Sequence, residues 1–366
     1  VNSKALEIAE IDLDTAVPAG GEMKLLADGA ISGHFTETAI GLILSKIPRY
    51  TKAELRHMVL AAQEHLLQLG ITSATDPAVD RDLLSVYKEM DANGELKLRI
   101  NAIPIRVPDG ANKVYPNPEH YHSAHLVVNT VKFFADGGLS GKTAAMLRPY
   151  KNDNTHGVLR LDAVTFQELA ASSQAAGFKI ATHAIGDAAI KMVLDVYTSI
   201  ASENKQNLCH RIEHLGFPDS HDLHTMCKLG IIAVMQPMFI EELGNNIMQN
   251  IDDQYLTYVY PVRNIIDASV TVAFSTDAPV VKQINPIKNI QAAITRKTNN
   301  GIHIAAEQAI SLEEAIYAYT MGSAIAGSQE AQLGSIEKGK FADFIILSDI
   351  QPEATQILQT YIAGNR

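Results

Sequence analysis

The sequence predicts an α/β fold built on a parallel sheet, and two observations lead to that prediction. Short β-rich runs alternate with amphipathic helices, and several helices end at a glycine that a strand follows at once. This order is typical of parallel βα units rather than hairpins. Seven strands are predicted, at residues 71–75, 97–103, 127–134, 178–182, 209–213, 231–235 and 270–275. They fit an open doubly wound sheet or a (β/α)8 barrel that lacks one strand.

The composition is ordinary for a soluble globular enzyme. The chain has 366 residues, a formal charge of −11, 46% hydrophobic and 19% charged residues, which is too apolar for disorder. An acidic chain without a Lys/Arg block is a poor partner for nucleic acid or anionic membranes. The two cysteines, Cys209 and Cys227, cannot form a disulfide framework, and no apolar run approaches the roughly 18 residues of a membrane span. We therefore expect a cytoplasmic location.

The first 70 residues are predicted to precede the barrel or to be inserted in it. Residues 22–26 and 30–35 form a hairpin that turns at Asp28-Gly29, a dipeptide typical of tight turns. A capping box of Thr51 and Glu54 then begins a helix that ends before Gly70.

Further helices are predicted within residues 71–330, which we assign to the barrel. A second capping box, Thr165 to Glu168, predicts a helix that ends at Gly177. Two more helices are predicted over 286–298 and 312–326, the second of them with Ser311 and Glu314 in capping-box spacing. The absence of a G-x-G-x-x-G turn after any strand argues against a nucleotide-binding open sheet.

The tail, residues 331–366, leaves this alternating pattern. Residues 341–347 form a β segment, and residues 360–365 read as another strand and turn. A small β appendage beside the barrel is therefore expected.

Polar side chains stand at several strand ends, where the chemistry of a barrel is located. The convergent set is Lys132, His183, His214 and Asp277. Zinc accepts this mixture of imidazole and carboxylate. Lys132 lies among apolar neighbours in a central strand, where a lysine is costly to bury unless it is paired or chemically altered.

The two histidines and the aspartate of this set each have a simpler structural explanation, whereas the lysine does not. A single strand-end histidine is more often a hydrogen-bonded core or loop residue, and an aspartate before Ala-Pro is an ordinary turn residue. Their joint occurrence favours a functional site. Other histidines are set aside: His120 and His122 precede their strand, and His221 and His224 fit a solvated helix face.

With these residues assembled, the chain resembles the amidohydrolase superfamily, and within it amidohydrolase family 3. The resemblance runs over essentially the whole chain. It is strongest in segments 131–137, 182–187, 211–214, 275–279 and 333–343.

The resemblance implies a TIM-type barrel of the metal-dependent hydrolase type, with a β-sandwich partly formed by the C-terminal tail. His183 and His214 would be ligands of one or two zinc ions. Lys132, when carboxylated, would bridge two metals, and Asp277 would bind metal and act as the catalytic proton shuttle. The implied reaction is hydrolysis of a non-peptide C–N bond, in an amide or formamide-like small molecule, by metal-activated water.

One departure from the family pattern opens alternatives. Family members carry an H-x-H pair at the end of the first barrel strand, and no such pair precedes residue 71 here. We therefore expect the family's N-terminal portion, with that strand, to be missing. The chain would then be either part of a hydrolase or a catalytically incompetent binding or regulatory protein. A Schiff-base lyase acting through Lys132 is a third interpretation, which leaves the two histidines unexplained.

Substrate contacts and self-association are also predicted. Arg148 and Tyr150, in the loop after the Lys132 strand, and Gln236, at the end of a later strand, are candidate substrate-binding residues. A structural role fits the loop residues equally well. A barrel without one strand exposes two sheet edges, so a homodimer or poor solubility is expected.

Overall fold

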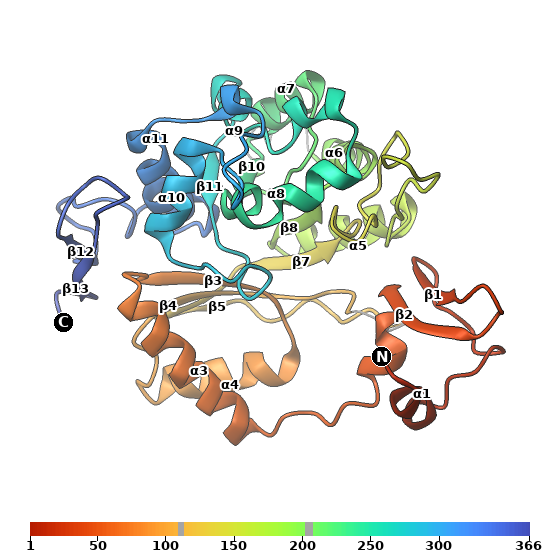
Figure 1. Ribbon diagram of the computed structural model, residues 1–366. Helices are drawn as coiled ribbons and strands as arrows, with labels where there is room; N and C mark the ends of the chain where they lie inside the picture. The colour runs from red at the N-terminus through yellow and green to blue at the C-terminus, as the bar shows by residue number, and fades with distance from the viewer. Residues whose placement is uncertain (109–112, 202–207) are drawn as a thin grey trace.

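A computed structural model describes residues 1–108, 113–201 and 208–366, and its centre is a set of parallel strands (Figure 1). The parallel strands are β3 (Ser73–Val79), β4 (Arg99–Pro104), β6 (Leu126–Val128), β7 (Thr130–Phe134), β8 (Lys179–Ala184), β9 (Arg211–His214), β10 (Ile232–Met235) and β11 (Val272–Phe274). They form two sheets, in the orders β3-β4-β6-β5 and β11-β10-β9-β8-β7, where β5 (Tyr121–His122) is antiparallel. Only Asn129 separates β6 from β7, and a parallel bridge between Ile105 and Lys132 joins the two sheets.

The strand order decides between the two predicted architectures. Along the two sheets, the parallel strands follow one another in chain order from β3 to β11. A doubly wound sheet would reverse its order at a switch point, whereas a barrel does not. Within the described residues no pairing joins β3 to β11, so the arrangement is an open barrel of seven strands, with β6 and β7 counted as one. The predicted strands are confirmed; a closed barrel is not formed.

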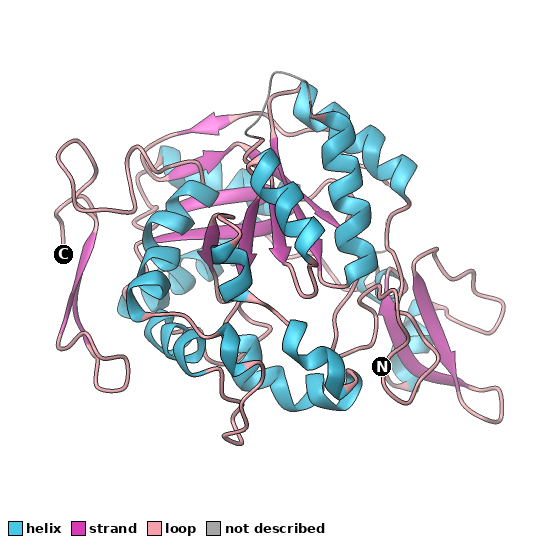
Figure 2. Cartoon of the chain, turned by 90° about the horizontal axis from the view of Figure 1, so that it is seen from above, coloured by secondary structure: helices cyan, strands magenta, loops and turns pink. Residues whose placement is uncertain are grey.

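Helices surround these strands (Figure 2). The barrel helices are α3 (Lys52–Gln68), α4 (Arg81–Ala92), α5 (Ala163–Ala175), α6 (Asp187–Ile200), α7 (Ser220–Leu229), α8 (Met238–Asn250), α9 (Val262–Asp267) and α10 (Pro286–Thr295), with 3-10 turns η1 (Asp253–Tyr258) and η2 (Ala306–Gln308). Strand alternation separates two environments on β7. Phe133 points outward and packs edge-on against Phe166 of α5, with ring centroids 5.3 Å apart, so Lys132 and Phe134 point the other way.

The helix boundaries confirm two capping predictions and correct the third. The capping boxes at Thr51 and Ser311 are both present. The helix α5 starts earlier than predicted, because Asp162 is its N-cap and accepts from the amide of Thr165. Aspartate is an N-cap of at least equal strength, which makes Thr165 an interior residue of the first turn.

The predicted helix over residues 312–326 is interrupted. It consists of α11 (Leu312–Tyr317), a π-helical turn, η3 (Ala318–Gly322), and α12 (Ser323–Ala326). The helix α10 ends at Thr295 instead of residue 298, because Arg296 adopts a left-handed φ of 49°.

The N-terminal segment lies beside the barrel, at the end opposite the C-terminal tail (Figure 1). It contains α1 (Ser3–Ala9), β1 (Gly21–Leu25), β2 (Ile31–Glu37) and α2 (Ile40–Leu44). The predicted hairpin is confirmed, since β1 and β2 pair antiparallel. Its turn uses both predicted residues: Asp28 accepts from the amide of Ala30 at 3.0 Å, and Gly29 has a φ of 83°.

The C-terminal tail forms a separate antiparallel pair, β12 (Phe344–Leu347) and β13 (Ile357–Tyr361). A buried bidentate ion pair ties this tail to the barrel: Arg99 Nε and Nη2 lie 2.6 and 2.9 Å from the carboxylate oxygens of Asp343. Phe341 covers the same guanidinium at 3.9 Å. In the part of the chain that is described, no second sheet faces β12 and β13, so the β-sandwich stays a prediction.

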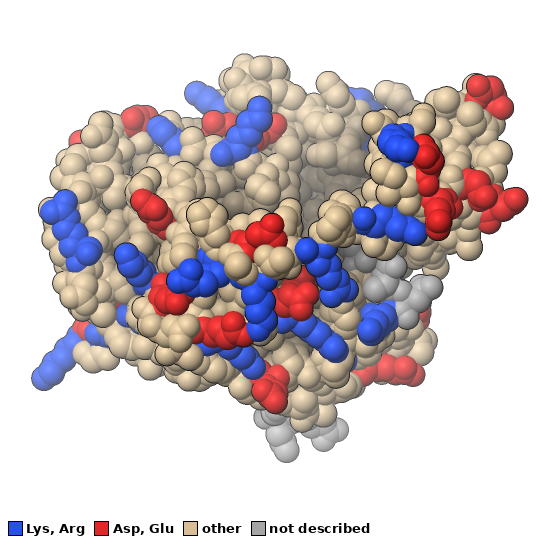
Figure 3. Space-filling model, turned by 90° about the horizontal axis from the view of Figure 1, so that it is seen from below, with Lys and Arg blue, Asp and Glu red and all other residues tan. Residues whose placement is uncertain are grey.

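The surface over α3 and α4 carries both signs of charge (Figure 3). Ion pairs such as Arg56 with Glu95 and Lys52 with Glu89 link neighbouring side chains there. Among the described helices, none has the length and hydrophobicity that crossing a bilayer requires.

Candidate active site

The four residues predicted at strand ends lie on neighbouring elements of the barrel. Lys132 is on β7, His183 on β8 and His214 at the end of β9, and these three strands are adjacent. The imidazole centroids of His183 and His214 are 4.5 Å apart. Asp277 follows β11, and its negative charge acts on both Lys132 and His214. The structure therefore places His183 and His214 side by side, with Lys132 on the neighbouring strand and Asp277 within electrostatic range of Lys132 and His214.

Lys132 is a cation in an apolar position. Its residue is 2% exposed, and its ammonium nitrogen lies 4.8 Å above the ring of Phe134. Burial lowers the pKa of Lys132 to about 8, although the charges of Glu213 and Asp277 oppose the shift. Among the described residues, no hydrogen bond or ion pair reaches its ammonium group. Within the described chain, Lys132 is therefore a buried lysine without a hydrogen bond or ion pair, the environment that the sequence analysis identifies as costly in free energy.

The proton on His183 can be assigned from its acceptors. Its Nε2 lies 3.0 Å from the carbonyl oxygen of Gly137 and 3.4 Å from Asp136 Oδ1. A carbonyl only accepts, so Nε2 carries the proton and Nδ1 keeps its lone pair. Burial, with the charges of His214 and Lys132, lowers the pKa of His183 well below its ordinary value. The ring is therefore neutral near pH 7.

A glutamine fixes the opposite tautomer of His214. Gln236 Nε2 donates to the carbonyl of Val234 at 3.2 Å and to Ser275 Oγ at 2.8 Å, which sets the orientation of its amide. Its Oε1 lies 2.8 Å from His214 Nδ1, so Nδ1 carries the proton and Nε2 keeps its lone pair. Burial lowers the pKa of His214, despite the opposing charge of Asp277.

These observations test whether the residues suit a metal ion. Two neutral imidazoles, one with a lone pair on Nδ1 and one with a lone pair on Nε2, are donors of the type that zinc binds. In the positions described, no three His, Cys, Asp or Glu side chains converge closely enough to hold a metal ion. The donor types and tautomers of the two histidines are those that a divalent ion binds, whereas the described side-chain positions do not themselves form a three-ligand site.

Asp136 is a structural residue of the site to which the sequence analysis assigned no role. Its buried carboxylate accepts amide hydrogens from Ala145, Ile185 and Gly186 at 2.8 to 3.0 Å. Burial raises the pKa of Asp136 to about 8, although these amide donors oppose the rise. The residue holds the turn after β8 against the loop after β7. Its position directly after a strand, before Gly137, was the available signal.

The three predicted substrate-binding residues make contacts inside the protein. The guanidinium of Arg148 lies 4.3 Å from the ring of Tyr255, and the buried hydroxyl of Tyr150 donates to the carbonyl of Ala144 at 2.9 Å. The amide of Gln236 supports His214 as described above. Substrate contact by these residues stays a prediction.

The histidines that were set aside lie away from this site. His120 stacks on Phe178, which precedes β8, with ring centroids 3.8 Å apart. It is therefore at the opposite, amino-terminal end of the strands. His221 and His224 are exposed on α7, in agreement with a solvated helix face.

Comparison with known proteins shows the family and the fold of the chain. Protein LONG AFTER FAR-RED 3 of Arabidopsis thaliana is 26% identical over 387 residues, which cover 100% of this chain and 66% of that protein. N-substituted formamide deformylase of Arthrobacter pascens is 26% identical over 388 residues, 99% of this chain and 70% of the enzyme. A solved metal-dependent hydrolase from Pyrococcus horikoshii shares the fold, with a TM-score of 0.78 and 24% identity over 96% of this chain and 69% of its own. The amidohydrolase family profile matches residues 1–366, and the chain belongs to that family.

Proposed function

We propose that this chain forms the larger part of a metal-dependent hydrolase that cleaves a non-peptide C–N bond in an amide or formamide-like small molecule. The observation that carries the proposal is the pair of complementary tautomers, His183 with a lone pair on Nδ1 and His214 with one on Nε2. Family membership supports hydrolysis, and the deformylase relative supports a C–N bond. The chain spans 66% of the length of its plant relative, so the activity is proposed for the whole protein.

Zinc is the proposed metal, with His183, His214 and Asp277 as its ligands. A zinc ion held there supplies Lewis-acid polarisation of a carbonyl and lowers the pKa of water. Carboxylation of Lys132 would form a bond between its nitrogen and the carbon of carbon dioxide, with loss of two protons from the ammonium group, and would convert a buried cation into an anion. That anion would be a ligand for a second ion.

Asp277 is the proposed proton carrier. Its carboxylate would take a proton from the attacking water as the new C–O bond forms, and would deliver it to the leaving nitrogen as the C–N bond breaks. The hydrogen bonds that the two imidazoles donate to the Gly137 carbonyl and to Gln236 Oε1 would keep both rings in fixed orientations during the reaction.

The test is the metal content of the protein. We expect elemental analysis of the 366-residue protein, purified from zinc-supplemented cells, to find about one zinc per chain. The double variant His183→Ala, His214→Ala should lose that zinc. The double variant His221→Ala, His224→Ala is the matched control and should keep it.

Two results would contradict the proposal: wild-type protein without zinc, or zinc retained by the His183→Ala, His214→Ala variant. The first would instead favour a catalytically incompetent binding or regulatory protein.

A further inference from the structure

A buried tyrosine, Tyr260, has a hydroxyl group to which the described residues offer no hydrogen-bond partner. The residue lies between η1 and α9 and is 4% exposed. Buried tyrosine hydroxyls usually have a partner, because desolvating a hydroxyl without a hydrogen bond costs free energy. Within the described chain, this oxygen is not one of the fully enclosed polar atoms that lack a partner, so it belongs to the small exposed part of the residue. A bound molecule can therefore reach it.

The backbone holds Tyr260 in one unfavourable conformation. Its φ is 47°, in the left-handed region that a residue with a side chain adopts only when its surroundings impose it. Its amide donates to the carbonyl of Gly216 at 2.8 Å, and its own carbonyl accepts from Arg296 Nη1 at 2.9 Å. Gly216 follows the candidate ligand His214 by two residues. The tyrosine is therefore fastened to the end of β9.

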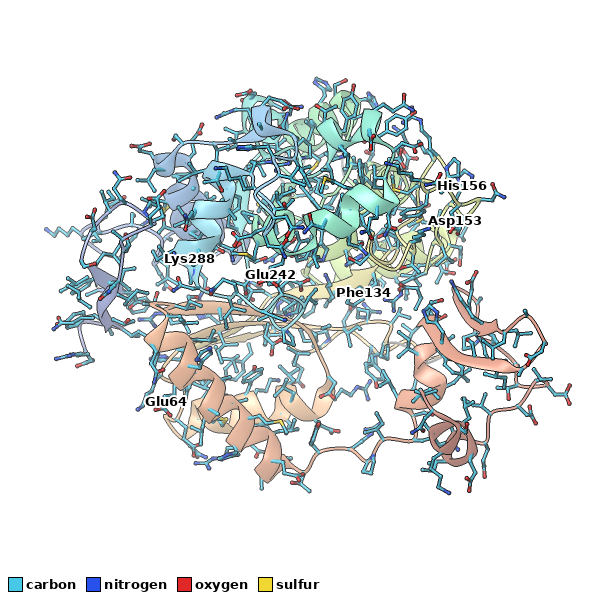
Figure 4. The ribbon with its side chains drawn as sticks, in the orientation of Figure 1. Glu64, Phe134, Asp153, His156, Glu242 and Lys288 are labelled. Carbon is cyan, nitrogen blue, oxygen red and sulfur yellow. The ribbon has the colours of Figure 1, made fainter. Side chains whose placement is uncertain are left out.

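The ring of Tyr260 is the last in a row of five rings that crosses the candidate site. The row begins at Phe134, labelled at the end of β7 in Figure 4, and continues through His183 and His214 to Phe239 on α8. Successive ring centroids, with Tyr260 as the last, are 5.3, 4.5, 5.8 and 5.8 Å apart. Phe239 stacks on His214 and meets Tyr260 edge to face. One phenyl ring thus separates the tyrosine from a candidate metal ligand.

Two carboxyl groups of the site interact electrostatically with this tyrosine. They are Asp136, whose Oδ1 is 3.4 Å from His183 Nε2, and Asp277, which also acts on His214. Burial and the charges of these two groups raise the pKa of Tyr260 well above its ordinary value. The hydroxyl therefore keeps its proton at neutral and moderately alkaline pH, and it is a constant hydrogen-bond donor on the side of the two histidines.

We propose that the Tyr260 hydroxyl donates a hydrogen bond to the carbonyl oxygen of the substrate. The inference deepens the proposed function and rests on it for the identity of that carbonyl. As water adds to the carbonyl carbon, the C=O double bond becomes a single bond and its electron pair moves to the oxygen. The hydrogen bond from Tyr260 strengthens with that charge, and the proton stays on the tyrosine. When the C–N bond breaks, the C=O double bond forms again.

The experiment removes one oxygen atom. Tyr260→Phe keeps the ring and its contact with Phe239. Tyr258→Phe is the matched control, because Tyr258 lies two residues earlier and is 54% exposed. The probe is N-phenethylformamide with carbon-13 in its formyl group, titrated into the 366-residue protein and followed by NMR. A chelator is present, so that no metal ion contributes to the interaction with the carbonyl oxygen.

We expect Tyr260→Phe to weaken binding of the probe about two- to tenfold, the loss of one hydrogen bond. A hydrogen bond to the carbonyl displaces the formyl carbon resonance downfield in the wild type, and in Tyr260→Phe the resonance of bound probe should move back towards that of free probe. Tyr258→Phe should change neither quantity.

Thermal melting without the probe separates this role from a structural one. A hydroxyl without a partner in the ligand-free protein contributes nothing to stability, so Tyr260→Phe should melt at the same temperature as the wild type or higher. A tyrosine whose hydroxyl supports the fold would melt lower after the same substitution. The expected pattern is therefore weaker binding of the probe without loss of stability.

Unchanged affinity for the probe in Tyr260→Phe would overturn the inference, and so would a lower melting temperature of that variant. Hydrolysis of the probe by zinc-supplemented protein is measured separately. Weaker binding in Tyr260→Phe without hydrolysis by the wild type would leave the hydrogen-bond donor and refute the hydrolase. Hydrolysis at the same rate by wild type and Tyr260→Phe would do the reverse.

Discussion

At the scale of single residues, Lys132 opposes folding whenever it is charged. Burial holds its pKa at about 8 in the folded chain, against 10.5 for an exposed lysine. Between these two values the unfolded chain binds a proton that the folded chain does not. The free energy of unfolding therefore rises as the pH increases from about 8 to 10.5, and below about 8 the full penalty applies.

We predict that Lys132→Met raises the free energy of unfolding at pH 7 by about 1–3 kcal/mol, because it replaces a buried cation by an apolar side chain of similar size. The gain should shrink between pH 8 and 10.5. Urea unfolding in the presence of a chelator and without bicarbonate measures it. The exposed Lys338 offers the control substitution Lys338→Met. A gain that does not change with pH would show that its origin is not the charge.

The candidate ligands could be predicted from the sequence, but their supporting groups could not. Lys132, His183 and His214 are recognisable because each lies in or at the end of a buried strand. The acceptors that set the tautomers, Gly137 and Gln236, depend on how neighbouring strands and loops align. Tyr260 lies 46 residues after His214 in the sequence (260 − 214), and nothing local indicates that the two belong to one row of rings.

At the scale of elements, the loop after β11 that carries Asp277 is fastened to α8. Glu242 accepts the amide hydrogens of Lys282 and Gln283 at 2.8 and 2.7 Å, one with each carboxylate oxygen. The two hydrogen bonds to the Glu242 carboxylate fix the loop at Lys282 and Gln283, on the C-terminal side of Asp277. The position of Asp277 depends on this anchor as well as on its own strand.

Glu242→Gln should loosen this loop, since one of the two charged acceptors becomes an amide NH2. We expect hydrogen exchange at Lys282 and Gln283 to accelerate about tenfold, in keeping with the strength of a hydrogen bond to a charged group. The neighbouring Glu241→Gln on the same helix is the control and should leave these amides unchanged. Unaltered exchange in Glu242→Gln would mean that the rest of the loop holds itself in place.

Element boundaries were predictable where a single strong signal was present. Thr51 and Ser311 have no competing cap nearby, so both helix starts were predicted. At α5 the sequence offers two candidate N-cap residues three positions apart, and the structure uses Asp162 instead of Thr165. The π-helical turn at Ala318–Gly322 packs against β11, and no sequence pattern marks it.

At the scale of the whole molecule, the open barrel leaves two strand edges, β3 and β11, unpaired within the described residues. The number of parallel strands and their positions along the chain were predictable from alternating β and helical patterns, whereas their order in the sheet was not. The positions of the two antiparallel pairs, β1–β2 and β12–β13, on opposite sides of the barrel could not be predicted, because the packing of short antiparallel pairs has no local sequence signature.

We propose that the β3 edge mediates self-association of the chain, as exposed edges do. Sedimentation velocity over a range of concentrations should show dimers or larger species. Thr75→Lys places a charge on an exposed position of β3 and should reduce them. Ala61→Lys adds the same charge to the exposed face of α3 and should not. A single monomeric species at every wild-type concentration would contradict the proposal.

The ion pair between Arg99 and Asp343 sets a minimum waiting time during synthesis. Its partners are 244 residues apart, and ribosomes add roughly 5 to 20 residues per second, so roughly 12 to 50 s pass between their translation. Throughout that interval Arg99 has no Asp343 carboxylate to meet. Strand β4, which carries Arg99, consequently reaches its final state only after Asp343 has been made.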